Sequence, residues 1–204
     1  NEKLDRKQAD IDQDTGSIVR TVAMNISGSN LKSFTTKGKK APTSKSTWYN
    51  FEMKYPKEEN ISALSWDPFY QLLRLIHEAD DSTFAEQIGL LADLDNLATY
   101  YVFMTAVGST DNMLKNLIFV QHDSESKFIL LPWDVDGAYG RMNDGTKRDI
   151  RVNQVVTNQL YQRLIRLDVD NFKDLLCQKW QNYKLVRRKY LHFSVWQMTP
   201  MWIN

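Results

Sequence analysis

The residues of this chain best suited to chemistry are three carboxylates and one amide that flank a short apolar region. Asp111 and Asn116 precede this region, and Asp134 and Asp136 follow it. Oxygen atoms of Asp and Asn side chains are ligands for hard cations such as Mg²⁺, which proteins often hold together with phosphate oxygens. If the fold brings these four side chains together, they form a candidate magnesium site.

The apolar region between them predicts a β-hairpin. Residues 117–120 and 128–131 have the β-branched and aromatic composition of strands, and the polar residues 123–127 are typical of a turn. Because a hairpin returns its second strand to the start of the first, the polar residues before and after it are expected to lie close together. A solvated acidic turn without a ligand is an open alternative, since structural clusters of acidic residues are common. Trp133 is expected to pack beneath the site.

The order of these parts is that of a protein-kinase catalytic loop and metal-binding segment. An Asp is followed five residues later by an Asn, then by a hairpin and an Asp close to a Gly. In kinases the first Asp accepts the proton of the substrate hydroxyl, and the Asn and the second Asp hold the metals. The His-Arg-Asp and Asp-Phe-Gly tripeptides of common protein kinases are absent.

The chain resembles the CotH family, the spore-coat protein H type of atypical kinase. The resemblance is specific over residues 93–140, where it rests on Asp95-Asn96, Asp111-Asn112, Lys115-Asn116 and Pro-Trp-Asp-Val-Asp-Gly-Ala-Tyr-Gly at 132–140. It is weaker over residues 16–92, where Lys-Tyr-Pro at 54–56 is similar to a tripeptide often found in the family.

The resemblance implies roles for individual residues. Asp111 would be the base that orients the acceptor hydroxyl, and Asn116 and Asp134 would coordinate Mg²⁺. Asp136 would be a second carboxylate near the metal, and Lys115 would either neutralise phosphate oxygens or face solvent. The cofactors implied are ATP and Mg²⁺, and the implied partner is a protein with Ser or Thr acceptors.

Arg20 is the point at which this chain departs from the family. CotH proteins frequently have Gly-x-Leu-Tyr-Lys where this chain has Gly-Ser-Ile-Val-Arg at 16–20, and that Lys serves the ATP phosphates. The planar guanidinium of Arg does not replace a compact ammonium in a tight phosphate pocket. A cofactor-binding role and a surface strand position both stay open for Arg20.

The fold class expected is α+β and atypical protein-kinase-like, with a mostly helical carboxyl-terminal lobe that carries the catalytic β-hairpin. The resemblance implies that residues 1–60 are the remnant of a nucleotide-covering lobe and that residues 61–204 form the helical lobe. Within the remnant, residues 27–47 are rich in Ser, Thr, Lys and Gly and predict a flexible loop.

Periodicity and capping residues predict the elements that position the site. Strands are expected at 16–22 and 48–55, and helices are expected from Asp67-Pro68, from a capping box at Thr83, over 93–107, over 154–167 and over 171–191. Asp95 and Asn96 are expected to serve the first turn of their helix, and Cys177 is expected to be a buried thiol.

Composition narrows the class of protein. The chain has 204 residues, of which 42% are hydrophobic, and a formal net charge of +1. This length is ample for a real core, and the small net charge gives no argument for a nucleic acid or membrane surface as partner. No apolar run approaches the roughly 18 residues that a membrane span needs. One cysteine excludes an internal disulfide framework, and three scattered histidines give no obvious zinc site.

Two other function classes stay open. A non-catalytic binding module of the same fold is favoured by Arg20 and by the implied loss of amino-terminal strands. A metal-dependent phosphohydrolase would use the carboxylates, but the chain lacks an identifiable His or further ligand set. The family implies a secreted, cell-surface or spore-coat setting.

Overall fold

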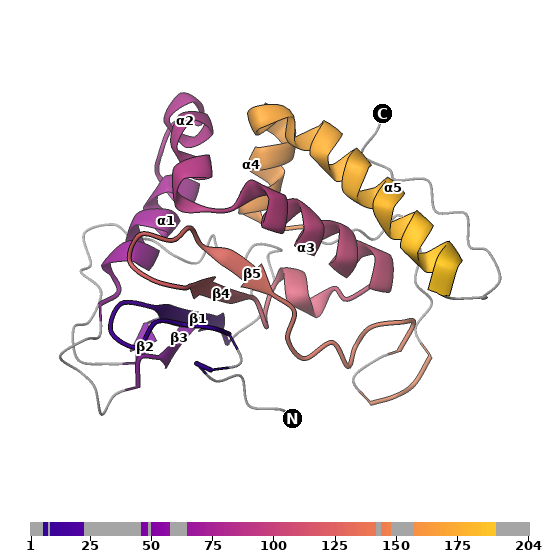
Figure 1. Ribbon diagram of the computed structural model, residues 1–204, viewed down its shortest axis with the longest axis horizontal. Helices are drawn as coiled ribbons and strands as arrows, with labels where there is room; N and C mark the ends of the chain where they lie inside the picture. Colours follow the sequence, from indigo (N-terminus) through magenta and orange to yellow (C-terminus); the bar gives the residue numbers. More distant parts are fainter. Residues whose placement is uncertain are drawn as a thin grey trace.

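The computed structural model describes residues 6–7, 9–22, 46–48, 50–57, 65–141, 144–147 and 157–190, with the side chains of 187–190 excepted (Figure 1). Most of the loop predicted at 27–47 lies outside these residues, as do the first three residues of the helix predicted at 154–167. The division into two parts at residue 60 stays a prediction.

Five strands form one antiparallel sheet in the order β2-β3-β1-β4-β5 (Figure 1). Their bounds are β1 Ser17–Thr21, β2 Thr47–Trp48, β3 Phe51–Tyr55, β4 Ile118–Gln121 and β5 Ile129–Leu131.

The predicted hairpin and the strand near residue 20 are confirmed. The single strand predicted over 48–55 is wrong, because the chain reverses between Trp48 and Phe51 and pairs β2 with β3. Asn50 lies in this turn, where its short polar side chain is favourable.

Strand β1 lies in the middle of the sheet and joins segments that are distant in the sequence. Val19 is opposite Met53 of β3 and opposite Phe119 of β4. At the end of β1, Thr21 is fully buried, and its Oγ1 accepts a hydrogen bond from the backbone N–H of Leu117 at 2.9 Å. β1 therefore fixes the position of the chain at the start of the hairpin.

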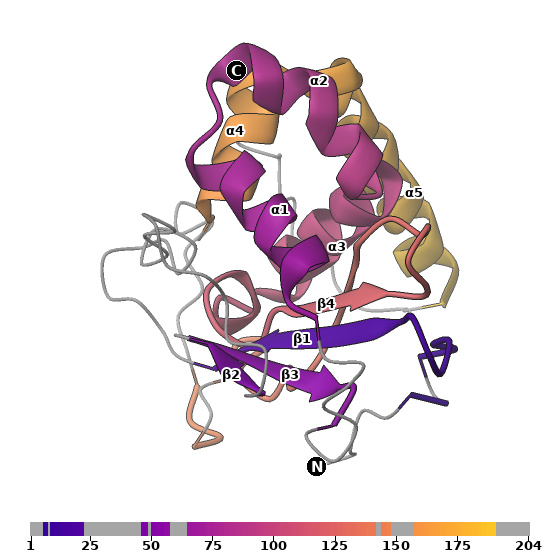
Figure 2. The ribbon, with the colours of Figure 1, turned by 90° about the vertical axis from the view of Figure 1, so that its left-hand side faces the viewer.

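Five helices cover one face of the sheet, as the two perpendicular views show (Figures 1 and 2). They are α1 Asp67–His77, α2 Asp81–Leu91, α3 Leu94–Val107, α4 Gln159–Leu167 and α5 Phe172–Tyr190. α3 packs against both β5 and α5. Within the part of the chain that the structure describes, none of the helices combines the length and the apolar character needed to cross a bilayer.

The helix boundaries follow from their capping residues. α1 starts as predicted, with Pro68 in its first turn and Phe69 buried. α2 begins at Asp81, so the predicted start at Thr83 is wrong. Asp80 is the N-cap instead, and its carboxylate accepts a hydrogen bond from the Thr83 N–H at 2.8 Å.

The main core lies between the sheet and the helices. The ring of Phe69 from α1 is at its centre, with ring centroids 4.8 Å from Phe51, 5.1 Å from Phe119 and 6.0 Å from Phe128. A smaller apolar cluster occupies the other face of the sheet, where Ile11 and neighbouring residues cover β1 and β4. Trp133 packs against this cluster, as predicted.

The carboxyl-terminal helices are joined to α1 by Arg163 of α4. Its guanidinium is buried over the Phe84 ring, at 4.1 Å from the ring centroid. It donates hydrogen bonds to the carbonyl oxygens of Leu75, Ile76, Ala79 and Asp80 and to the Asp81 carboxylate. The carbonyls of Leu75 and Ile76 lie in the last turn of α1, where helix geometry leaves carbonyls without intrahelical partners. On α5, Cys177 is half-buried rather than buried as predicted, because it lies beside the apolar stripe and not in it.

Candidate functional site

Helix α3 places the first part of the site. It begins at the N-cap Asp93, ends at Gly108 in the left-handed conformation with φ 69°, and leads directly into a 3₁₀ turn at Asp111–Met113. Gly tolerates this conformation without a steric penalty, so the helix stops at a defined residue. Asp111 is therefore attached to a rigid element that packs on the sheet.

Asp95 and Asn96 have structural contacts, as predicted, but the cap of the first turn is Asp93, whose carboxylate accepts a hydrogen bond from the Asn96 N–H at 2.9 Å. The Asn96 side chain accepts a hydrogen bond from the Leu130 N–H at 2.7 Å and donates to the Leu130 carbonyl at 3.3 Å. Asp95 pairs with Lys179 of α5, with 2.6 Å between carboxylate oxygen and Nζ. These contacts set the start of α3 relative to β5 and α5.

Asn112 links the two halves of the candidate site. Its side chain is fully buried, accepts a hydrogen bond from the Ser109 hydroxyl at 2.5 Å and donates one to the Trp133 carbonyl. Burial raises the pKa of Tyr100, so this phenol stays protonated and donates to the backbone carbonyl of Asn112 at 2.8 Å. The 3₁₀ turn and the segment after β5 are therefore held together next to Asp111 and Asp134.

The hairpin brings Asn116 and Asp134 together, as the sequence predicted. Ile118 of β4 is opposite Leu131 of β5, so the residues on either side of the hairpin meet at one end of the sheet. The Asn116 Nδ2 donates to Asp134 Oδ2 at 3.4 Å. Both side chains are half-buried.

Asn116 and Asp134 share an unusual backbone conformation. Their φ angles are 60° and 54°, which lie in the left-handed region. Asn and Asp tolerate this region better than other non-glycine residues, and backbone strain of this kind is concentrated at functional sites. The pair therefore meets through two strained positions that face one another.

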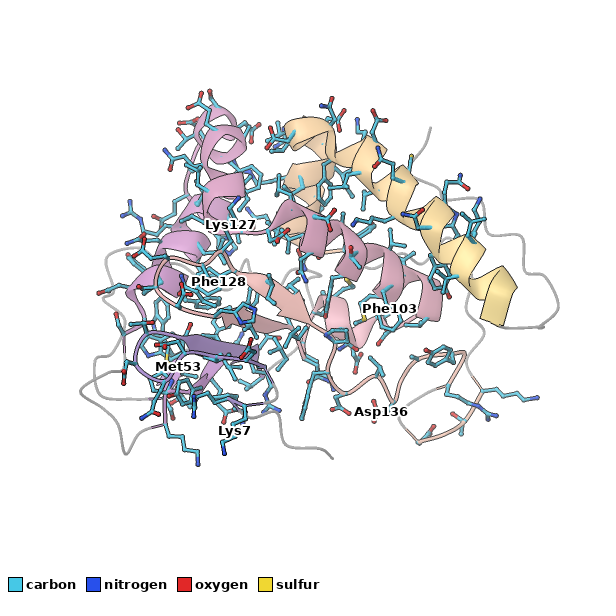
Figure 3. The ribbon with its side chains drawn as sticks, in the orientation of Figure 1. Lys7, Met53, Phe103, Lys127, Phe128 and Asp136 are labelled. Atoms are coloured by element: carbon cyan, nitrogen blue, oxygen red, sulfur yellow. The ribbon has the colours of Figure 1, made fainter. Side chains whose placement is uncertain are left out.

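Asp111 and Asp136 make contacts of other kinds. Asp111 forms an ion pair with Lys115 across one turn of chain, with 3.1 Å between Oδ2 and Nζ. Asp136 is exposed on the loop that follows β5, where its Oδ1 accepts a hydrogen bond from the Gly137 N–H at 2.8 Å (Figure 3). Among the described residues, no group of three or more His, Cys, Asp or Glu side chains is close enough to hold a metal ion. The expected convergence of three carboxylates on one point is therefore not observed.

Arg20 lies on the face of the sheet opposite the helices. It is paired in register with Glu52 of β3 and Ile118 of β4, and its guanidinium is 3.0 Å from the Glu52 carboxylate. Glu52 also binds Lys54, at 2.6 Å. Directly opposite residues of an antiparallel sheet have their side chains on the same face. One row of side chains therefore crosses the strands from Glu52 through Arg20 and Ile118 to Leu131. This row lies at the end of the sheet where Asn116 is found.

Two positioning residues of the site were not predicted from the sequence. In the sequence, Asn112 is only the neighbour of Asp111, and Thr21 is only part of a predicted strand. Neither has a spacing that distinguishes it from a surface polar residue. Their importance comes from full burial and from partners more than 20 residues away in Trp133 and Leu117.

Comparison with known proteins agrees with the residues that first suggested the family. No curated protein sequence matches the chain significantly. The family model described as CotH kinase protein matches residues 2–194, which include the whole of the described sheet, all five helices and the candidate site. The chain therefore belongs to the CotH kinase protein family.

Proposed function

We propose that this chain is a CotH-type atypical kinase that transfers the γ-phosphoryl group of ATP to a Ser or Thr hydroxyl of a protein. The observation that carries the proposal is the contact between Asn116 and Asp134 at the ends of the β4–β5 hairpin, at 3.4 Å. In kinases an Asn and an Asp in this order hold the metal ions that bridge the phosphates of ATP.

Asn116 and Asp134 would hold Mg²⁺. An Asn that donates through Nδ2 retains Oδ1 as an acceptor, and a carboxylate supplies a second hard oxygen. Asp136 is exposed, follows Asp134 by two positions in the sequence and would add a carboxylate near the ion. The metal would neutralise charge on the phosphate oxygens, and water and phosphate would supply the remaining ligands, since Mg²⁺ seldom takes an all-protein cage.

Asp111 would orient the acceptor hydroxyl and receive its proton. In the transfer, the hydroxyl oxygen forms a bond to the γ-phosphorus, and the bond from that phosphorus to the bridging oxygen breaks to release ADP. Lys115, at 3.1 Å from Asp111, keeps positive charge beside the carboxylate and would also attract the phosphate oxygens of bound ATP. Most of the rate acceleration would come from positioning and electrostatics.

The part of the sheet face around Arg20 would be the nucleotide surface, because Ile11 and its neighbours cover the rest of β1 and β4. Arg20 is oriented by Glu52, and its row leads across Ile118 and Leu131 towards the Asn116 end of the sheet. The half-buried Leu131 would offer apolar surface to a base. Arg20 would contact phosphate as a fork of hydrogen-bond donors rather than as the compact ammonium frequent in the family.

A thermal melt with and without ATP and Mg²⁺ tests this proposal. Asp134→Asn removes the charge but keeps a residue that tolerates the left-handed backbone. Asp170→Asn is the matched control, because Asp170 also has a positive φ, of 49°, and is exposed between α4 and α5. A ligand at about a hundred times its dissociation constant adds about 2.7 kcal/mol, which corresponds to roughly 5 to 10 °C for a chain of this size.

We expect the full shift in the parent and in Asp170→Asn, and none in Asp134→Asn. Transfer of labelled γ-phosphate to Ser- and Thr-containing proteins is expected to follow the same pattern. No shift in the parent would overturn the nucleotide site and leave the binding-module interpretation. We also propose a secreted, cell-surface or spore-coat setting, which immunolocalisation would test.

A further inference from the structure

Tyr139 is the most exposed of the large hydrophobic side chains in the described part of the chain. It is 71% exposed, next to Leu90 at 70%. Single exposed hydrophobic residues are ordinary on protein surfaces. What sets Tyr139 apart is its backbone and its position five residues after Asp134.

The backbone of Tyr139 is strained. Its φ is 56°, in the left-handed region that bulky L-residues seldom adopt. Glycine at 137 and at 140 shows that the loop has residues suited to such a conformation on both sides of the Tyr. Strain of this kind persists when surrounding contacts impose it, and it is concentrated at functional sites.

Hydrogen bonds fix Tyr139 relative to the segment 107–112, which contains Asp111. Its N–H donates to the carbonyl of Val107, the last residue of α3, at 2.7 Å. The flanking turn is closed by a bond from the Arg141 N–H to the Ala138 carbonyl at 3.1 Å. Together with the bond between Asn112 and Trp133, these contacts tie segment 107–112 to segment 133–139 at both ends.

The candidate site lies between these two ties. Asp111 is four residues from Val107, so an extended chain would separate them by at most about 14 Å. An extended substrate spans that distance in about four residues. A side chain that contacts Tyr139 would therefore belong to a residue within about four positions of the acceptor hydroxyl.

We propose that Tyr139 is a docking residue for the substrate polypeptide, on which an apolar or proline side chain near the acceptor Ser or Thr packs; this rests on the kinase function proposed above. A tyrosine ring offers a flat apolar face with little conformational entropy to lose, while its hydroxyl stays in water. Arg141 and Lys147 are bridged to one another on the adjacent loop and are both exposed, so a basic substrate side chain would be repelled.

The test uses Tyr139→Gly with Leu90→Ala as the matched control. Glycine removes the ring and also relieves the left-handed strain, so the melting temperature should be no lower than that of the parent. Leu90 has the same exposure but lies on α2, at a distance from the loop (Figure 1). The probes are Ser peptides in which one Leu or Pro is moved through the four positions on each side of the acceptor.

We expect the parent and Leu90→Ala to prefer an apolar residue at one of these positions, with a KM about tenfold lower than that of the all-alanine peptide. In Tyr139→Gly that preference should disappear through KM, while kcat at saturating peptide is retained. A preference that survives in Tyr139→Gly would overturn the docking role. So would a change confined to KM for ATP. Absence of any transfer by the parent would overturn the kinase function and the docking role together.

Discussion

Asn112→Ala should destabilise the chain more than the few side-chain atoms it removes would suggest. The substitution removes the hydrogen bonds from the Ser109 hydroxyl and to the Trp133 carbonyl, and it leaves a buried hydroxyl without its acceptor. Two hydrogen bonds at about 1 kcal/mol each, with a further 1 kcal/mol or more for the unsatisfied hydroxyl, give about 3 kcal/mol. For a chain of this size the melting temperature should fall by about 6 to 12 °C.

A double-mutant cycle measures the part due to the Ser109–Asn112 bond. Ser109→Ala should cost about 1 to 2 kcal/mol, and the double variant should cost about 1 kcal/mol less than the sum, because both single changes break the same bond. Asn182→Ala on the exposed side of α5 is the control and should leave the melt nearly unchanged. Calorimetry on the four proteins supplies these values. A fall of less than 2 °C in Asn112→Ala would refute the argument that this side chain holds the two segments together.

Three further predictions concern other parts of the fold. Arg20→Gln should raise the dissociation constant for MgATP about tenfold, measured by calorimetric titration, with little loss of stability because Glu52 retains Lys54. Arg163→Met should lower the free energy of unfolding in urea by about 3 kcal/mol or more, because it leaves buried carbonyls without a hydrogen-bond donor. Burial lowers the pKa of His77 to about 4 from an ordinary 6.5, so the unfolded chain binds the proton first and stability falls as pH drops from 6.5 to 4. His77→Gln should remove this contribution, at most about 3 kcal/mol, from melts compared across that range.

Each of these has a result that would contradict it. Unchanged MgATP affinity in Arg20→Gln would make Arg20 a structural strand residue. Arg166→Ala is the control for Arg163, because Arg166 is an exposed partner of the same Asp81. It should leave the free energy of unfolding nearly unchanged. Equal losses in the two variants would mean that the buried carbonyls do not depend on Arg163. A His77→Gln chain that loses as much stability in acid as the parent would show that other groups cause the loss.

Local signals in the sequence were sufficient for the elements that have them. The start of α1 at Asp67-Pro68, the extent of α3 and the hairpin before Asp134 were all predicted and confirmed. Each depends on residues within a few positions of one another. The start of α2 was missed because two residues that can serve as N-cap, Asp80 and Thr83, lie only three positions apart.

Long-range pairing and backbone conformation were beyond the reach of sequence patterns. The placement of β1 between β3 and β4 depends on partners on both sides that are distant in sequence, and nothing in Ser17–Thr21 specifies them. The left-handed conformation of Asn116 and Asp134 likewise follows from the contacts around them. The site was therefore predicted as a set of residues, whereas its geometry, with contact between Asn116 and Asp134 but no group of three carboxylates among the described residues, required the structure.

The central position of β1 also has a consequence for how the chain folds as it is made. Ile18 pairs with Val120, and these two residues are 102 positions apart. At about 5 to 20 residues per second, β1 would wait roughly 5 to 20 s during synthesis before its β4 partner emerges. Pairing of such distant segments is also intrinsically slow. The backbone N–H of Asn116 donates to the Thr21 carbonyl at 3.2 Å, so the position of Asn116 depends on β1 as well as on the hairpin, and the complete arrangement forms only once these distant segments have paired.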